Sequence, residues 1–60
     1  MKYKVGDKVK ITTGKHSEVW CDEMKHLEGT TTTIMEKIGR FYITNEEWSI
    51  DDDDIEGLVE

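Results

Sequence analysis

The segment TTTTIMEKIGRFYITNEEWSI, residues 30–50, constrains the fold of this chain more than any other stretch. It is rich in threonine, isoleucine and aromatic side chains, which favour strands, and Gly39 in its middle favours a turn. The polar connector NEE interrupts the pattern once more. This order predicts a three-stranded meander, the smallest sheet that presents a stable apolar face in water. The strands are predicted at residues 30–38, 40–44 and 48–50.

The hairpin around Gly39 has two possible registers. A three-residue turn would place Glu36 opposite Arg40 as an attractive pair. A two-residue turn or a bulge would instead place Ile34 and Ile43 together on the inner face. We favour the second register, because burial of two isoleucines contributes more than one exposed ion pair.

The segments on either side of the meander predict the outer strands. Lys8–Ile11 alternates polar and apolar residues, which predicts a strand with Val9 and Ile11 facing inward. The four consecutive aspartates of residues 51–54 cannot form a strand interior and predict a turn or a short 3₁₀ segment. Ile55–Leu58 then predicts a short final strand.

Residues 17–29 have a helical rather than a strand pattern. Trp20, Met24 and Leu27 fall at i, i+4 and i+7, and Ser17 can cap a helix. The segment is too short to be stable alone. It therefore predicts one or two helical turns in a long loop that Trp20 pins to the core.

Together these elements predict an all-β fold with one short helical turn, a small five-stranded SH3-like barrel. With 60 residues the chain forms one domain, residues 1–60, and has a thin core. The last strand of such a barrel commonly lies beside the first. The acids near the C-terminus would then lie near the N-terminal lysines.

Charge is segregated along the chain. The net charge is −6, with five lysines and one acid in residues 1–15 and eight acids and no base in residues 46–60. Nonspecific nucleic-acid binding depends on basic groups, so we expect no direct nucleic-acid partner. The excess of acid predicts a partner with a basic surface, unless it only balances the lysines. The candidate partner-binding residues are Glu46, Glu47, Asp51, Asp52, Asp53, Asp54, Glu56 and Tyr42.

No pattern indicates catalysis, a metal or a cofactor. The five-residue steps between His16, Cys21 and His26 do not place them on one helix face for zinc, and they predict an exposed loop with a part-buried thiol. No group is seen to orient His26 against Cys21 as a catalytic pair. The aspartate run lacks the alternate spacing and the glycine of a calcium loop. We therefore expect no enzyme, no bound metal and no cofactor.

The sequence favours a cytoplasmic location. A single cysteine, Cys21, excludes an internal disulfide and fits a reducing compartment. No apolar run approaches the ~20 residues of a membrane span, and the N-terminus has no apolar signal region. We expect no membrane partner.

Several short motifs resemble small SH3-like proteins of Firmicute phages and prophages. They are VGDKVKI, the loop pattern W-x3-M-x2-L-x-G, TTTI, FYI, Trp48 and DIE, and together they cover nearly the whole chain. That family has no common activity, so the resemblance implies a mobile genetic element as the source but assigns no functional residue. The run of four aspartates departs from many of its members.

These observations predict a non-catalytic phage or mobile-element accessory protein that acts in the host cytoplasm. Its expected role is an anti-CRISPR-like defence inhibitor, a viral protein whose acidic surface binds a basic, nucleic-acid-handling host protein. The alternative is a general SH3-like interaction module that docks an extended peptide on aromatic residues or a sheet edge. We expect a monomer or a weak homodimer.

Overall fold

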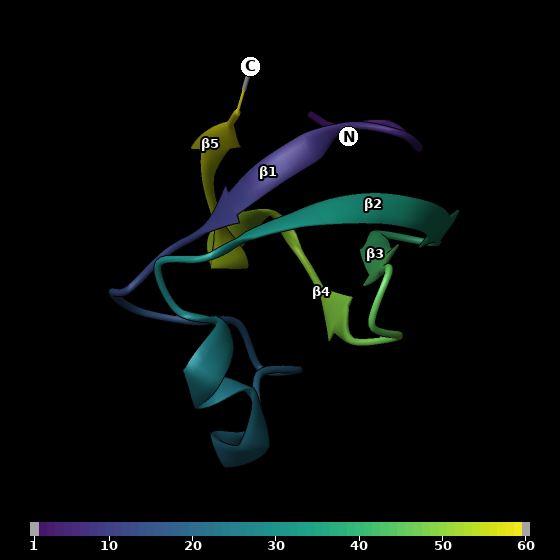
Figure 1. Cartoon of the computed structure of the whole chain (residues 1–60). Coiled ribbons are helices and arrows are strands. Elements are labelled where there is room, and N and C mark those ends of the chain that lie inside the picture. The colour runs from purple at the N-terminus through teal and green to yellow at the C-terminus, as the bar shows by residue number, and fades with distance from the viewer. Residues whose placement is uncertain (1, 60) are drawn as a thin grey trace.

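The computed structural model describes residues 2–59, and its five strands form one antiparallel sheet (Figure 1). The order across the sheet is β4-β3-β2-β1-β5, so the last strand lies beside the first. This is the predicted small all-β domain with SH3-like strand order, although β4 and β5 form no ladder within residues 2–59 to close the barrel. The elements are β1 (Lys8–Ile11), η1 (Asp22–Leu27), β2 (Thr31–Ile38), β3 (Phe41–Thr44), β4 (Ser49–Ile50), η2 (Asp52–Asp54) and β5 (Ile55–Leu58), where η marks a 3₁₀ helix.

Strand β2 connects the two halves of the sheet. Its first residues pair with β1, as in Lys10 opposite Thr31, and its later residues pair with β3. The register of the β2–β3 ladder shifts between Ile34 and Glu36, which leaves Met35 as the extra residue of a bulge. A bulge bends its strand and increases the local twist, so β2 curves around the core where it passes from one partner to the other.

The β2–β3 hairpin has the favoured two-residue turn. Ile38 pairs with Phe41, which leaves Gly39 and Arg40 as the turn residues. Gly39 has φ +60°, a left-handed conformation that a two-residue hairpin requires and that glycine adopts without steric cost.

The prediction that Ile43 shares the inner face with Ile34 is wrong. Ile34 pairs with Thr44 across the ladder, and directly paired residues point to the same face. Alternation along β3 then turns Tyr42 inward and Ile43 outward. Tyr42 is 0% exposed and Thr44 2%, whereas Ile43 is only half-buried.

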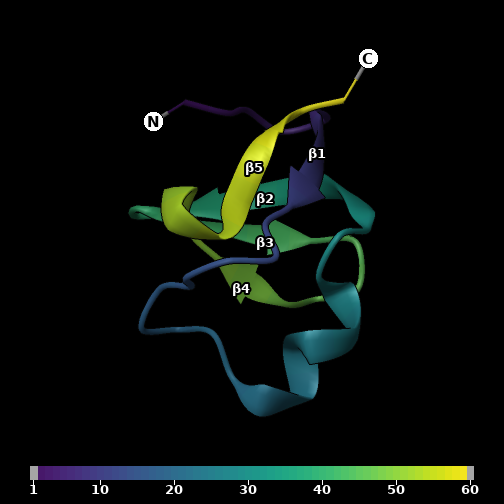
Figure 2. The same ribbon diagram turned by 90° about the vertical axis from the view of Figure 1, so that its left-hand side faces the viewer.

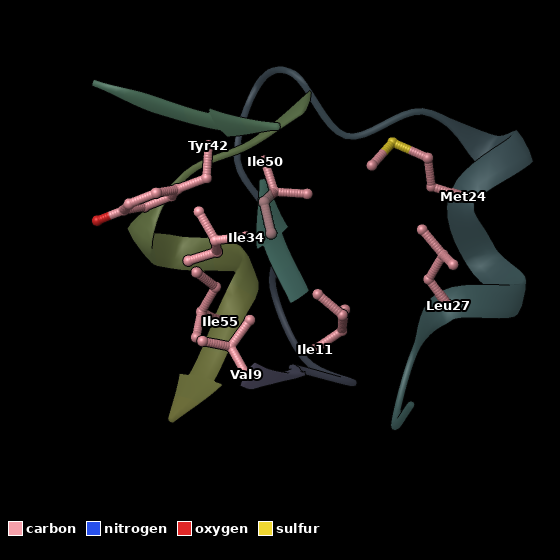
Figure 3. Packing of buried hydrophobic residues seen from close by; sticks show 8 residues of the cluster. All are labelled: Val9, Ile11, Met24, Leu27, Ile34, Tyr42, Ile50 and Ile55. Carbon is pink, nitrogen blue, oxygen red and sulfur yellow. The ribbon is translucent and has the colours of Figure 1, made fainter. Parts of the chain in front are cut away.

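Residues 12–30 form the long loop, which lies below the sheet at the end away from the C-terminus (Figure 2). Its helical part, η1, begins after Cys21, whose side chain makes no capping hydrogen bond. Ser17 is therefore not the helix cap that its position predicted. Met24 and Leu27 are buried as expected and point from η1 toward the strands (Figure 3).

One apolar core fills the space between the sheet and η1 (Figure 3). Trp20 and Trp48 are half-buried and pack against its rim, which confirms that a tryptophan anchors the loop to the barrel. The buried members are Val9, Ile11, Met24, Leu27, Ile34, Tyr42, Ile50 and Ile55.

Truncation of Ile34 tests this core. Ile34→Ala should lower the free energy of unfolding by about 2–5 kcal/mol, because it leaves a cavity around a fully buried side chain. Ile38→Ala is the matched control on the same strand, since Ile38 is 54% exposed and should change stability by less than about 1 kcal/mol. Urea unfolding measures both variants. Equal losses would contradict the register described above.

Candidate functional site

The aspartate run forms a structural turn rather than a uniformly solvated charge patch. It is the 3₁₀ helix η2, as predicted, and two of its side chains close it as a capping box. Asp51 Oδ1 accepts a hydrogen bond from the Asp53 N–H at 2.8 Å, and Asp54 Oδ2 accepts one from the Asp51 N–H at 3.1 Å. The carboxylates of Asp51 and Asp54 therefore stabilise the turn itself.

Asp54 is the buried end of this turn, with 0% of its surface exposed. Its Oδ1 accepts a hydrogen bond from the Ser17 N–H at 2.8 Å, and its Oδ2 accepts one from the Ser17 hydroxyl at 2.5 Å. These bonds join residues that lie 37 positions apart in the sequence. Ser17 thus ties the long loop to η2 instead of capping η1.

His16 completes the same cluster and is not the exposed loop residue that the sequence predicted. Its Nδ1 lies 3.1 Å from Asp54 Oδ1, its Nε2 lies 2.7 Å from Glu28 Oε2, and only 11% of its side chain is exposed. The ring of Trp20 stacks on it with the centroids 3.6 Å apart and the planes 3° from parallel. We call His16, Ser17, Glu28 and Asp54 the loop anchor.

Tyr42 and Asp52 form a second internal contact. The Tyr42 hydroxyl donates a hydrogen bond of 2.6 Å to Asp52 Oδ1 and accepts one of 3.3 Å from the Tyr3 N–H. Burial raises the pKa of Tyr42 above its ordinary value, and the hydrogen bond to Asp52 raises this pKa further.

Two predicted partner-binding residues are therefore removed from the candidate surface. Tyr42 and Asp54 are both 0% exposed and cannot contact a partner in this conformation. The sequence pattern did not distinguish them, because Tyr42 lies in a run of three apolar residues and Asp54 in a run of identical ones.

The acids that remain accessible gather around the edge strand β4. Two precede it in the β3–β4 turn. Three follow it, Asp51 as the N-cap of η2 and Asp52 and Asp53 within it, and no more than about 14 Å of extended chain separates Glu47 from Asp51. Three are exposed and two are half-exposed. We call this set, Glu46, Glu47, Asp51, Asp52 and Asp53, the acidic edge.

Glu56, the last predicted residue, belongs to a different contact. It lies on β5, and its Oε2 is 3.6 Å from Lys10 Nζ on β1. Within residues 2–59 this is the one ion pair that joins a lysine or arginine to a carboxylate. The N-terminal lysines therefore do not balance the acidic edge through direct ion pairs.

Glu47 has an unusual backbone conformation. Its φ is +68°, in the left-handed region that costs a residue other than glycine about 1–2 kcal/mol. The buried Thr44 holds the turn in this shape, because its Oγ1 accepts hydrogen bonds from the N–H groups of Glu46, at 3.3 Å, and Trp48, at 3.1 Å.

Residues 2–59 contain no group of three or more histidine, cysteine, aspartate or glutamate side chains placed to hold a metal ion, and they enclose no pocket. Cys21 is exposed, so the expected part-buried thiol is wrong. His26 lies at the surface, where its Nδ1 is 2.9 Å from the Glu23 carbonyl oxygen. No helix in the described part of the chain is long and apolar enough to cross a membrane.

Comparison with models of known protein families, with curated proteins and with solved structures found no match. The SH3-like description of the fold therefore rests on the strand order and on the pairing of β5 with β1.

Replacement of Asp54 tests the loop anchor. In Asp54→Asn, either orientation of the amide turns its NH₂ group toward a backbone N–H donor, that of Ser17 or that of Asp51. We expect a loss of about 2–4 kcal/mol in the free energy of unfolding. Asp53→Asn is the matched control one position earlier, where the exposed side chain should tolerate the change within about 0.5 kcal/mol. Urea unfolding of both variants measures the difference, and a stable Asp54→Asn protein would contradict this role.

The raised pKa of Tyr42 predicts weaker folding in alkali. The unfolded chain loses the Tyr42 proton first, so stability is fully present below about pH 10 and falls as the pH rises further. Urea midpoints measured at about pH 8 and pH 11 should differ more in the parent protein than in Tyr42→Phe, which has no phenol to ionise. An equal alkaline loss in both proteins would show that other groups cause it.

Proposed function

We propose that this protein is a non-catalytic accessory protein of a phage or mobile element that inhibits a basic, nucleic-acid-handling protein of its host, such as a defence nuclease. The acidic edge would bind that partner in the host cytoplasm. The resemblance to phage SH3-like proteins supports the source, and the charge of the acidic edge supports the class of partner.

The observation that carries the proposal is the position of the accessible acids. Five acidic residues flank one short edge strand in the chain, two before it and three after it, and the N-terminal lysines do not form ion pairs with them. Like charges held this close repel one another and weaken the compact state. A basic partner would relieve that repulsion, and its association would be steered by the field of the edge.

The conformation of Glu47 supports the same surface. Glycine would occupy this left-handed position at lower cost, yet the chain places a charged side chain there. Strained backbone conformations of this kind persist only where the surrounding structure holds them, and they cluster at functional sites. Glu47 is exposed in the turn before β4, and Thr44 fixes that turn through its hydrogen bonds to the neighbouring N–H groups of Glu46 and Trp48.

The chemistry of nucleic-acid binding explains the choice of partner. Surfaces that bind phosphate backbones present lysine and arginine, and their affinity depends on the negative charge that they meet. The carboxylates of the acidic edge carry the same negative charge as the phosphates of a nucleic acid. Binding at such a surface would exclude the natural ligand by direct competition.

The second candidate is a module that docks an extended peptide. Trp48 favours it, because this half-buried ring lies directly before the edge strand β4, and its centroid is 6.2 Å from that of His26. An added peptide strand could pair with the open edge of β4 while its side chains contact the ring. Such binding would depend little on salt.

The test compares two variants of equal net charge. E46Q/E47Q/D53N removes three exposed acids of the acidic edge, whereas E18Q/D22N/E36Q removes three exposed acids elsewhere. Proteins captured from a Firmicute host lysate on the immobilised parent are identified, and their association rates with each variant are measured at low and high salt. The first variant should associate at least about tenfold more slowly at low salt, and the second should resemble the parent.

Three outcomes decide between the candidates. Displacement of the parent by duplex DNA, together with a steep fall of affinity in salt, supports inhibition at a nucleic-acid surface. Equal rates for the two variants would contradict a role for the acidic edge. Binding that resists salt but is lost in Trp48→Ala would favour the peptide-docking module.

Glu47→Gly separates binding from folding at one position. It should raise the free energy of unfolding by about 1 kcal/mol, because glycine has no Cβ atom and so avoids the steric cost of the left-handed conformation. The same change should slow association with the captured partner. A variant that is more stable and binds as fast as the parent would show that the strain at Glu47 has no functional purpose.

A further inference from the structure

The loop anchor contains one titratable ring, His16, that plays no part in the function proposed above. Both ring nitrogens of His16 face carboxylate oxygens, Asp54 Oδ1 at 3.1 Å and Glu28 Oε2 at 2.7 Å. An ionised carboxylate only accepts hydrogen bonds, and a neutral imidazole has one N–H group and one bare nitrogen. A neutral ring would thus leave one lone pair against a carboxylate oxygen in either tautomer.

Asp54 cannot supply the missing proton. Its oxygens already accept hydrogen bonds from the N–H groups of Ser17 and Asp51 and from the Ser17 hydroxyl. These donors favour the ionised carboxylate, because a protonated oxygen would lose acceptor capacity that the buried donors need. The Asp54 side is therefore satisfied when His16 donates from Nδ1.

The surroundings of His16 favour a positive ring on the Glu28 side as well. The charged groups that face it are Asp54 from η2 and Glu28 from the end of η1, and within residues 2–59 neither carboxylate forms an ion pair with lysine or arginine. Trp20 covers one face of the ring, and the electron-rich face of an indole attracts a cation.

We propose that His16 is a pH-sensitive latch, which in its doubly protonated form holds the tip of the long loop, residues 16–20, against η2. Loss of one proton leaves a bare ring nitrogen against a carboxylate oxygen, which breaks one of the two contacts and loosens this tip. The rest of the loop stays in place. Its base is held by backbone bonds from Ile11 to Thr30 and from Gly29 to Ile11, and by the buried side chains of Met24 and Leu27.

The first measurement uses the unmodified protein. Correlation of ring nitrogens and ring protons by ¹⁵N NMR at about pH 5.5 should find both nitrogens of His16 protonated. A neutral ring at this pH, with a bare Nε2 that accepts a proton from Glu28, would overturn the proposal.

The second measurement follows the loop itself by solvent exchange of backbone amides from about pH 5.5 to 8, corrected for the intrinsic pH dependence of exchange. The amides of Ser17, bonded to Asp54, and Trp20, bonded to the Ser17 carbonyl, should lose about tenfold or more of their protection. The Ile34 amide, which is bonded to the Asp7 carbonyl in the sheet, should keep its protection.

Two variants locate the effect. His16→Gln has no ring to titrate and should show no such pH dependence, whereas His26→Gln, which changes the exposed histidine, should behave like the parent. A parent protein with constant protection, or a His16→Gln protein that keeps the transition, would contradict the latch. If His16→Gln fails to fold, the NMR signals of the parent still decide the question.

Discussion

One buried carboxylate, that of Asp54, holds the tip of the long loop to η2. Its two oxygens meet donors from both sides, the Ser17 and Asp51 N–H groups, the Ser17 hydroxyl and the His16 ring. A domain of 60 residues has a thin apolar core, and its 19-residue loop between β1 and β2 contributes only two buried apolar side chains to it. A buried charge is costly unless it is fully hydrogen-bonded, and here that requirement fixes the position of the loop.

Elements governed by local periodicity could be predicted from the sequence. The alternation around Val9 and Ile11, the helical spacing of Met24 and Leu27, and the inability of four aspartates to form a strand interior each led to the element that the structure contains. Burial of Asp54 could not be predicted in this way. Nothing local distinguishes it from its three neighbours, because the partners that bury it, Ser17 and His16, lie 37 and 38 positions away.

The prediction of which β3 residues face inward was wrong for a different reason. Phe41, Tyr42 and Ile43 are consecutive apolar residues, so alternation gives no preference for either face. The choice depends on Met35, since a one-residue bulge at this position reverses the face on which the following residues of β2 lie relative to β3. A bulge of this kind has no signature in the residues themselves.

Some of the acids of residues 46–56 make contacts that stabilise the fold, and others do not. Asp51 and Asp54 close η2, Asp52 accepts the hydrogen bond of a buried tyrosine, and Glu56 pairs with a lysine. The side chain of Asp53 accepts no hydrogen bond within residues 2–59, and Glu47 occupies a backbone conformation that favours glycine. Folding alone would accept neutral residues at both positions and would gain stability at the second. The charges that the fold does not need are therefore exposed, and they come before and after the same edge strand in the chain.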